Sequence, residues 1–211
     1  MSKPKLIIIG AGGHARSCIN LIEELNNFEI AGLIDDFDHD KVNDRSFVYP
    51  FVGRDSDLFG LADKYKYVFI AIGQIKSASR RMQLYNQTNK LGFVLPKIIA
   101  STAYVSANAK VGDGTVIMHG AIINAGAVVG NNCIINSRAL IEHDSIVGDH
   151  CHISTGAVLN GGVNIGRGSF IGSGCIVKNG VYIGKDCLIG MGVNVKHDLK
   201  DGVVLKDSNL L

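Results

Sequence analysis

Tryptophan is absent from the 211 residues, proline occurs only three times, and the five cysteines form no CxxC pair. Without paired or zinc-type spacing, the cysteines indicate neither a disulfide framework nor a metal site. Glycine, by contrast, occurs 26 times. Many glycines with few prolines suit a repetitive, tightly turned structure.

The sequence also lacks an excess of charge and any long apolar run. Its 21 basic and 19 acidic residues leave a formal charge of +2, which gives no electrostatic signature of nucleic-acid or anionic-membrane binding. The start, MSKPKLIIIGAGG, has no signal-peptide pattern, and no apolar run is long enough to cross a bilayer. We therefore expect a cytoplasmic protein with a small or locally recognised partner, no nucleic acid and no membrane insertion.

Strands and helices alternate over residues 1–96. KLIIIG (5–10), EIAGLIDD (29–36) and YVFIAIG (67–73) have the composition of short buried strands, and residues 14–25 and 77–92 carry helical patterns. Such a β-α-β series predicts a small parallel, Rossmann-like sheet covered by helices.

A six-residue repeat begins at Ile99 and defines a second domain over residues 97–211. Seventeen consecutive hexads, such as INAGAV VGNNCI INSRAL IEHDSI, each begin with Ile, Val or Leu, and the fifth position is almost always small. Four of the five cysteines occupy that fifth position, which identifies them as small core residues. These are Cys133, Cys151, Cys175 and Cys187.

A second period of 18 residues lies over the hexads. Glycine follows the aliphatic residue at Gly112, Gly130, Gly148, Gly166 and Gly184. Three hexads therefore make one coil of a triangular parallel β-helix, in which first and fifth positions point into a narrow core. The pattern resembles the hexapeptide-repeat acyltransferases, and that resemblance implies a left-handed helix, whereas parallel crossovers are usually right-handed.

The sixth position of each hexad alternates with the inward positions and should face outward. It is nevertheless mostly apolar, so this outer surface should be covered, most simply by copies of the same chain. Together with the resemblance to the hexapeptide-repeat acyltransferases, this implies a homotrimer with a coenzyme A groove between neighbours. The apolar residues at this position are Val116, Ile122, Val128, Ile134, Leu140, Ile146, Val158, Phe170, Ile176 and Leu188.

The turn IIIGAGGHA (7–15) lies between a strand and a helix and matches G-x-G-x-x-A, with Asp35 and Asp36 a little over 20 residues later. Glycine turns of this kind present backbone N–H groups to phosphate, and an acid at the next strand end can accept a hydrogen bond from ribose or base. A domain of this size favours a mononucleotide or nucleotide sugar over NAD. A vestigial docking domain is a further alternative.

Three of the seven histidines stand in LIEHDSIVGDHCHISTG (140–156). Zinc carbonic anhydrases built on this prism use two histidines five residues apart, and no two histidines here have that spacing, so we expect no metal. By spacing alone, His143 is either a solvated corner residue or a general base whose pKa is raised by Glu142 and Asp144. Its column of equivalent positions holds Ala107, Ala125, Gly161, Asn179 and His197.

The motifs together resemble the bacillosamine N-acetyltransferases and sialic-acid O-acetyltransferases of bacterial glycan pathways over essentially the full chain. They are the GxGGHx turn, the DD and AIG strand ends, and IEHD, VGDHCHISTG, IGSG and IGMG in the prism. The resemblance implies that His143 accepts the proton, that Asp144 increases its basicity, and that acetyl-CoA is the co-substrate. It places acetyl-CoA contacts at His152, Ser173 and Met191, and substrate contacts at Gly12, Gly13, His14, Asp35, Asp36 and Gly73. His150 and His39 are left as loop residues.

We therefore expect an acetyl-CoA-dependent acetyltransferase acting on a UDP-4-amino sugar. The alternatives are O-acetylation of a sialic or related nonulosonic acid, for which Arg80, Arg81 and Arg138 are the candidate carboxylate anchors, and a non-catalytic trimeric scaffold. Two departures stand out: the chain ends GVVLKDSNLL instead of the GxPA-type tail that helps to hold coenzyme A, and Gln74 stands where several relatives carry Asn.

Overall fold

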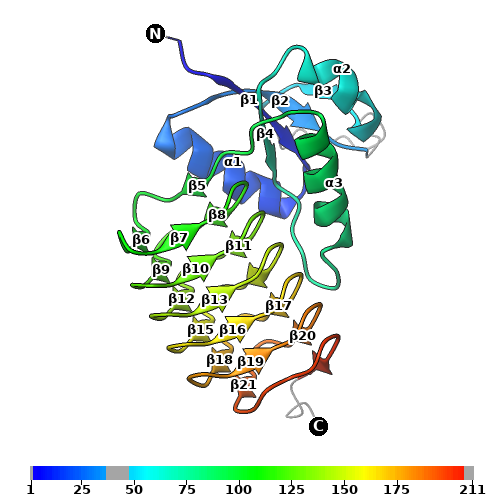
Figure 1. Ribbon diagram of the computed structural model, residues 1–211. Helices are drawn as coiled ribbons and strands as arrows, with labels where there is room; N and C mark the ends of the chain where they lie inside the picture. The colour runs from blue at the N-terminus through cyan, green and yellow to red at the C-terminus, as the bar shows by residue number, and fades with distance from the viewer. Residues whose placement is uncertain (1, 37–47, 207–211) are drawn as a thin grey trace. The chain divides into compact units, whose positions relative to one another are not determined.

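The computed structural model describes residues 2–36 and 48–206, and these fold as two compact units (Figure 1). The first unit comprises residues 1–73 and 83–96, and the second comprises residues 74–82 and 97–211. The repeat pattern led us to expect residues 74–82 in the first domain, whereas in the structure this stretch packs with the second unit. His39 lies outside the described residues.

The first unit is a parallel sheet of four strands in the order β3-β2-β1-β4. Its core combines apolar side chains of the strands with those of the helices, including Ile7, Ile9, Leu58 and Leu84. This confirms the predicted Rossmann-like sheet. Its elements are β1 (Lys5–Ile9), α1 (Gly13–Leu25), β2 (Glu29–Ile34), β3 (Phe51–Gly53), the 3-10 helix η1 (Asp55–Asp57), α2 (Leu58–Ala62), β4 (Tyr67–Ile70) and α3 (Ser79–Lys90), whose first residues belong to the second unit.

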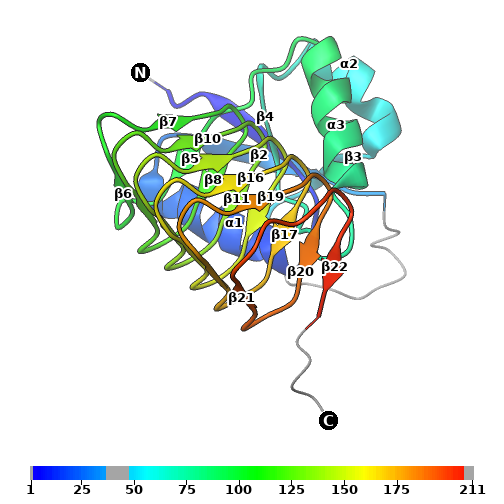
Figure 2. The ribbon, with the colours of Figure 1, turned by 60° about the horizontal axis from the view of Figure 1, so that its bottom comes forward.

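The second unit is a left-handed parallel β-helix, as predicted. Two-residue strands at every sixth position form three parallel sheets, and each strand pairs with the strand one coil away. Figure 2 shows the turns of successive coils stacked on one another. Face one consists of β5 (Ile98–Ile99), β8 (Val116–Ile117), β11 (Ile134–Ile135), β14 (His152–Ile153), β17 (Phe170–Ile171), β20 (Leu188–Ile189) and β22 (Val204–Leu205).

The other two faces complete the triangle. Face two consists of β6 (Tyr104–Val105), β9 (Ile122–Ile123), β12 (Leu140–Ile141), β15 (Val158–Leu159), β18 (Ile176–Val177) and β21 (Asn194–Val195). Face three consists of β7 (Lys110–Val111), β10 (Val128–Val129), β13 (Ile146–Val147), β16 (Asn164–Ile165) and β19 (Tyr182–Ile183). We call the turns from face one to two, two to three, and three to one the first, second and third corners.

First and fifth hexad positions fill the interior of the prism, as the repeat predicts. Ile141, Ala157, Leu159 and Cys175 are all fully buried. Burial raises the pKa of the Cys151 thiol well above its ordinary value, because the thiolate is poorly solvated there. The core cysteines are therefore packing residues rather than nucleophiles.

The fourth hexad position adopts the left-handed conformation in every hexad from residue 111 to residue 194. Glycine is favoured there because it has no Cβ to clash with the backbone. Where another residue stands in that position it is Asn, Asp, Arg or His, as at Asn132, Arg138 and Asp144. The backbone conformation of each turn is thus the same, and the residue type varies at the third position beside it.

The outward sixth positions divide into two classes. On face one, Val116 and Ile134 are buried within the chain, so their apolar side chains need no partner molecule. On faces two and three, Ile122, Ile146 and Ile176 are 40%, 44% and 46% exposed. Faces two and three therefore leave exposed apolar side chains at these positions, which a copy of the chain would cover.

Residues 74–82 are held on the prism by a buried arginine. Arg81 is 2% exposed, and its guanidinium donates to Gln74 Oε1 at 2.7 Å, to the carbonyl of His150 at 3.4 Å and to the carbonyl of Asn132. The Asn132 amide returns a hydrogen bond to the Arg81 carbonyl at 3.2 Å. Gln74 also donates to the Gly168 carbonyl at 2.9 Å, so both side chains serve to attach this segment.

Arg81→Met should lower the free energy of unfolding by roughly 2–4 kcal/mol, because buried carbonyls would lose their donors. The exposed Lys76 of the same segment provides the control, and Lys76→Met should change stability by less than about 0.5 kcal/mol. Urea midpoints of the three proteins check this. Equal midpoints for Arg81→Met and wild type would show that the buried guanidinium does not anchor the segment.

No helix among residues 2–36 and 48–206 is long and apolar enough to cross a membrane.

Candidate functional site

The predicted proton acceptor stands at the second corner of the prism. His143 occupies the third position of its hexad, two residues after the end of β12, and its side chain is 62% exposed. Its Nδ1 lies 2.9 Å from Asp144 Oδ2. Because a carboxylate only accepts hydrogen bonds, Nδ1 carries the proton and Nε2 of the neutral ring keeps its lone pair.

The acidic neighbours of His143 are themselves held in place. Asp144 is in the left-handed conformation with φ 58°, which turns its carboxylate back toward the imidazole. Glu142 accepts hydrogen bonds from the Asn124 amide at 2.9 Å and from the His143 backbone N–H at 3.3 Å. The hydrogen bond to Asp144, followed by the charges of Asp144 and Glu142, raises the pKa of His143. The arrangement is that of an exposed, oriented base.

The residues predicted to contact acetyl-CoA lie elsewhere on the prism. Ser173 and Met191 are third-position residues of the first corner, and Met191 is 68% exposed. His152 stands on face one, is 8% exposed, and packs edge-on against Phe170 with ring centroids 5.1 Å apart. The structure therefore does not place these three residues at the corner that carries His143.

His152 is fixed in one tautomer. Its Nδ1 donates to the Gln74 carbonyl at 2.7 Å, and burial lowers its pKa to about 4. Its Nε2 is a buried acceptor without a hydrogen-bond partner among the described residues. A buried acceptor of this kind needs a donor, and the amide N–H groups of the pantetheine arm of acetyl-CoA are donors of the required type.

His150 was predicted to be a loop residue, and it does lie in a turn, but it is not solvated. It is 7% exposed, and its Nδ1 lies 3.0 Å from the Asn132 amide. Burial lowers its pKa. His150 therefore belongs to the network that attaches residues 74–82.

In the first unit, the predicted substrate residues gather at the carboxyl ends of β1, β2 and β4. Gly12 caps the amino end of α1, and the positions of Gly12 and Gly13 are open. A Cβ on Gly73 would lie 3.4 Å from His14 Cβ, so these two residues are neighbours. Backbone N–H groups at a helix amino end form an anion-binding site suited to phosphate.

The two predicted acidic contacts also support the fold of the first unit. Asp35 Oδ2 accepts a hydrogen bond from the Ala11 backbone N–H at 2.7 Å, which fixes the glycine turn. Asp36 Oδ1 accepts from the Asp55 backbone N–H at 3.1 Å. A substitution at either acid would therefore disturb a loop as well as any ligand, and their predicted contact with substrate stays a prediction.

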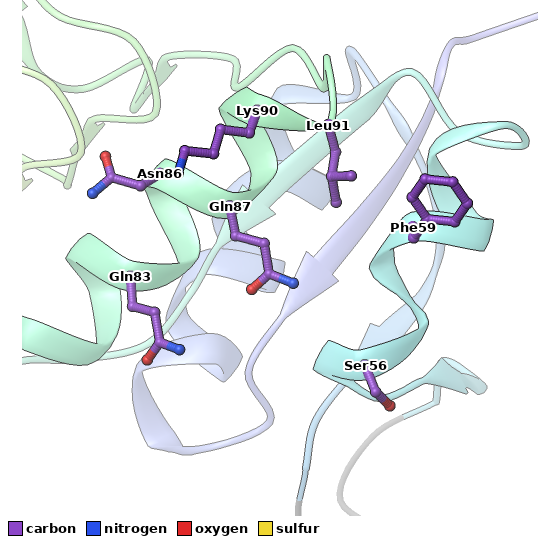
Figure 3. A pocket seen from close by; sticks show the side chains of 7 residues that line it. All are labelled: Ser56, Phe59, Gln83, Asn86, Gln87, Lys90 and Leu91. Atoms are coloured by element: carbon purple, nitrogen blue, oxygen red, sulfur yellow. The ribbon is translucent and has the colours of Figure 1, made fainter.

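A hollow of about 490 Å³ in the first unit lies between α3 and the η1–α2 segment (Figure 3). Its residues are Ser56, Phe59, Gln83, Asn86, Gln87, Lys90 and Leu91. They include none of the predicted substrate residues, so this hollow gives no support to any predicted contact. Within the described part of the chain, no group of three or more His, Cys, Asp or Glu side chains is arranged to hold a metal ion.

The buried neutral state of His152 predicts acid sensitivity. The unfolded chain binds a proton at His152 near pH 6.5, whereas the folded chain does so near pH 4, so stability falls as pH drops through this window, by up to about 3 kcal/mol. His152→Asn keeps an N–H donor for the Gln74 carbonyl but cannot titrate. Its urea midpoint should fall less between pH 7 and pH 4.5 than that of wild type, while the exposed control His197→Asn should follow wild type. Burial lowers the pKa of His150 as well, so part of the dependence of the urea midpoint on pH should remain in His152→Asn. The same pH dependence in all three proteins would contradict the role of His152 in acid sensitivity.

Family models match both halves of the chain. The PglD N-terminal domain matches residues 5–88, and the bacterial transferase hexapeptide model of six repeats matches residues 108–143, 126–161 and 162–197. No curated protein sequence gives a significant match.

Solved structures match nearly the full chain. The acetyltransferase domain of PglB from Neisseria gonorrhoeae, in complex with acetyl coenzyme A, is 32% identical, with a TM-score of 0.87 and 97% of each chain covered. PerB from Caulobacter crescentus, in complex with CoA and GDP-perosamine, is 32% identical, with a TM-score of 0.88 and coverage of 99% of this chain and 96% of that one. WeeI from Acinetobacter baumannii, 21% identical with a TM-score of 0.82 and 96% of each chain covered, shares the fold. The chain therefore belongs to the PglD-like family of hexapeptide-repeat sugar acetyltransferases.

Proposed function

We propose that this sugar acetyltransferase transfers the acetyl group of acetyl-CoA to the amine of a nucleotide-linked amino sugar, with His143 as the general base. The observation that carries the proposal is the exposed His143–Asp144 pair, in which the 2.9 Å hydrogen bond at Nδ1 leaves Nε2 free to accept a proton. The full-length likeness to a PglB acetyltransferase domain with bound acetyl coenzyme A supports it.

The proposed reaction is a direct transfer. The amine nitrogen attacks the thioester carbonyl carbon, the new C–N bond forms as the C–S bond breaks, and Nε2 of His143 takes the proton from nitrogen and passes it to the departing thiolate. Asp144 stabilises the imidazolium formed on the way, because its carboxylate faces the protonated Nδ1. Backbone N–H groups of the coils are the proposed donors to the carbonyl oxygen.

The acceptor is proposed to bind through its nucleotide to the first unit, with phosphate at Gly12, Gly13 and His14. Our predicted acceptor is a UDP-4-amino sugar, and PerB, which was solved with GDP-perosamine, makes a GDP-linked amino sugar an equal candidate. Release of free CoA thiol, measured with UDP-linked and GDP-linked amino sugars and with sialic acids, separates these acceptors. Arg81, one of the candidate carboxylate anchors for a sialic acid, is buried among backbone carbonyls, which disfavours the O-acetylation alternative.

His143→Ala should lower kcat by roughly 10²–10⁴, the usual contribution of a positioned general base. Its melting temperature should stay near wild type, because an exposed third-position side chain contributes nothing to the core. His197→Ala, in the same column three coils further along and also exposed, is the matched control and should retain wild-type kcat. A wild-type kcat in His143→Ala, or calorimetry without heat of acetyl-CoA binding to the wild-type protein, would favour the scaffold alternative.

Asp144→Asn tests the pairing through the pH dependence of kcat/KM. The base must be neutral to act, so kcat/KM rises with pH through the pKa of His143, which the hydrogen bond to Asp144 and its charge raise. Removing that carboxylate lowers the pKa and should move the acidic limb of the profile to lower pH, with a smaller loss of kcat than in His143→Ala. A limb that moves to higher pH would contradict the pairing.

We further propose that the site is completed by a second copy of the chain in a homotrimer. His143 stands at the second corner and the predicted acetyl-CoA contacts Ser173 and Met191 at the first, one hexad away along face two. Six residues at about 3.3 Å each separate the corners by up to roughly 20 Å. Within one chain, this distance keeps a thioester held at the first corner away from His143 at the second corner, unless acetyl-CoA extends across face two. A neighbouring chain, however, can place its own second corner against the first corner of this chain.

Complementation between two defective chains tests this assembly. His143→Ala and the double variant Ser173→Trp/Met191→Trp should each be inactive as homotrimers, since one lacks the base and the other has a blocked cofactor corner. Co-expressed at equal levels, they should form mixed trimers with one intact site each and recover about a quarter of the wild-type rate, by the counting of closed threefold symmetry. No recovery despite mixed trimers, or a stable monomer in light scattering, would rule out the composite site.

A further inference from the structure

Gly161 occupies a position where the backbone does not require glycine. It is the third residue of its hexad, at the second corner, in the column that also holds Ala107, Ala125, His143, Asn179 and His197. The left-handed conformation belongs to the next residue, Gly162, with φ 67°, and Gly161 itself lies outside that region. Every other residue of the column has a Cβ, so some other constraint accounts for its absence here.

The space that a side chain on Gly161 would need is filled by the imidazole of His143. A Cβ added to Gly161 would lie 2.6 Å from His143 Nε2 and 2.7 Å from Cε1, and 3.3 Å from Asn179 Nδ2. Favourable contacts between such atoms begin at about 3.5 Å. The ring of His143 therefore rests in a recess one coil further along, and that recess exists because Gly161 has no side chain.

The other glycine beside the pair is less informative. Gly126, one coil before Asp144, is also close to that residue, since a Cβ there would meet Asp144 Oδ1. Its φ is 75°, however, and this conformation alone favours glycine. Gly161 is thus the residue of the second corner whose lack of a side chain is explained by the position of the His143 ring.

We propose that Gly161 is a positioning residue for acetyl transfer, whose missing side chain leaves room for the His143 imidazole with Nδ1 on Asp144 and Nε2 beside Gly161. This inference rests on the proposed role of His143. A methyl group at Gly161 would push the ring out of the recess and lengthen the 2.9 Å hydrogen bond to Asp144. Gly161 makes no contribution to the first and fifth positions that form the core, so the prism itself should be unaffected.

Gly161→Ala should lower kcat by roughly 10- to 100-fold, the cost of displacing a catalytic group by about 1 Å. It should also lower the pKa of His143, measured by NMR titration of the imidazole, because the hydrogen bond that raises it is weakened. Gly60→Ala is the matched control: Gly60 is exposed, has no atom near an added Cβ and is in the first unit, so kcat and the His143 titration should stay at wild-type values.

A double-mutant cycle with His143→Ala decides whether Gly161 acts through the ring. With the imidazole gone, the additional change Gly161→Ala should alter the residual rate by less than about twofold, and any loss of melting temperature in the single variant should be restored. Persistence of the full loss of rate in the double variant, or an unchanged His143 titration in Gly161→Ala, would overturn the inference. A wild-type kcat in His143→Ala would instead overturn the role of the base, while the titration would still report on the recess.

Discussion

Pairing between residues eighteen apart is the constraint on which the second unit depends. Leu140 pairs with Val158, and Val158 with Ile176, in parallel register, so each residue is bonded to the residue one coil away. A slip by one residue would exchange the core and the surface along the whole sheet. The eighteen-residue register therefore assigns each hexad position one role, with aliphatic and small residues inside and polar groups at the corners.

This register also makes the corners rigid with respect to one another. His143 is fixed to the second corner by the strands on either side of it, β12 and β13, and Ser173 and Met191 are fixed to the first. No loop movement within one chain brings two corners together, since the faces between them are hydrogen-bonded sheets. If the proposed roles of these residues hold, acetyl transfer requires the assembled trimer. The exposed apolar residues of faces two and three would then be buried between the chains.

Much of the fold could be predicted from the sequence because its signals are periodic. Seventeen hexads with a second period of eighteen residues predict a parallel β-helix over residues 99–200. The glycine turn after KLIIIG likewise predicted the first strand and the first helix. We expected residues 74–82 with the first domain, whereas this segment packs with the second unit through the buried guanidinium of Arg81 and the side chain of Gln74. Both look like surface residues in a helical pattern.

Some features of the candidate site could be predicted from the sequence and others could not. The charged run around His143 and its hexad position were sufficient to single out an outward histidine beside two acids. The burial of His150 was not, since it depends on Asn132, eighteen residues away, and on residues 74–82. The sequence shows Gly161 in the column of equivalent positions, but only the position of the His143 ring explains why it is glycine.

At the second corner, third and fourth hexad positions can vary at low cost because they are separated from the core. A left-handed Asp144 costs about 1 kcal/mol relative to glycine, whereas truncating a buried first-position residue such as Ile141 costs about 2–5 kcal/mol. Polar residues can therefore be exchanged at a corner without loss of the prism. The side chains at the corner then set the orientation of the His143 imidazole. Asp144 supplies the carboxylate that orients the ring, and Gly161, which has no side chain, leaves the space in which the ring lies.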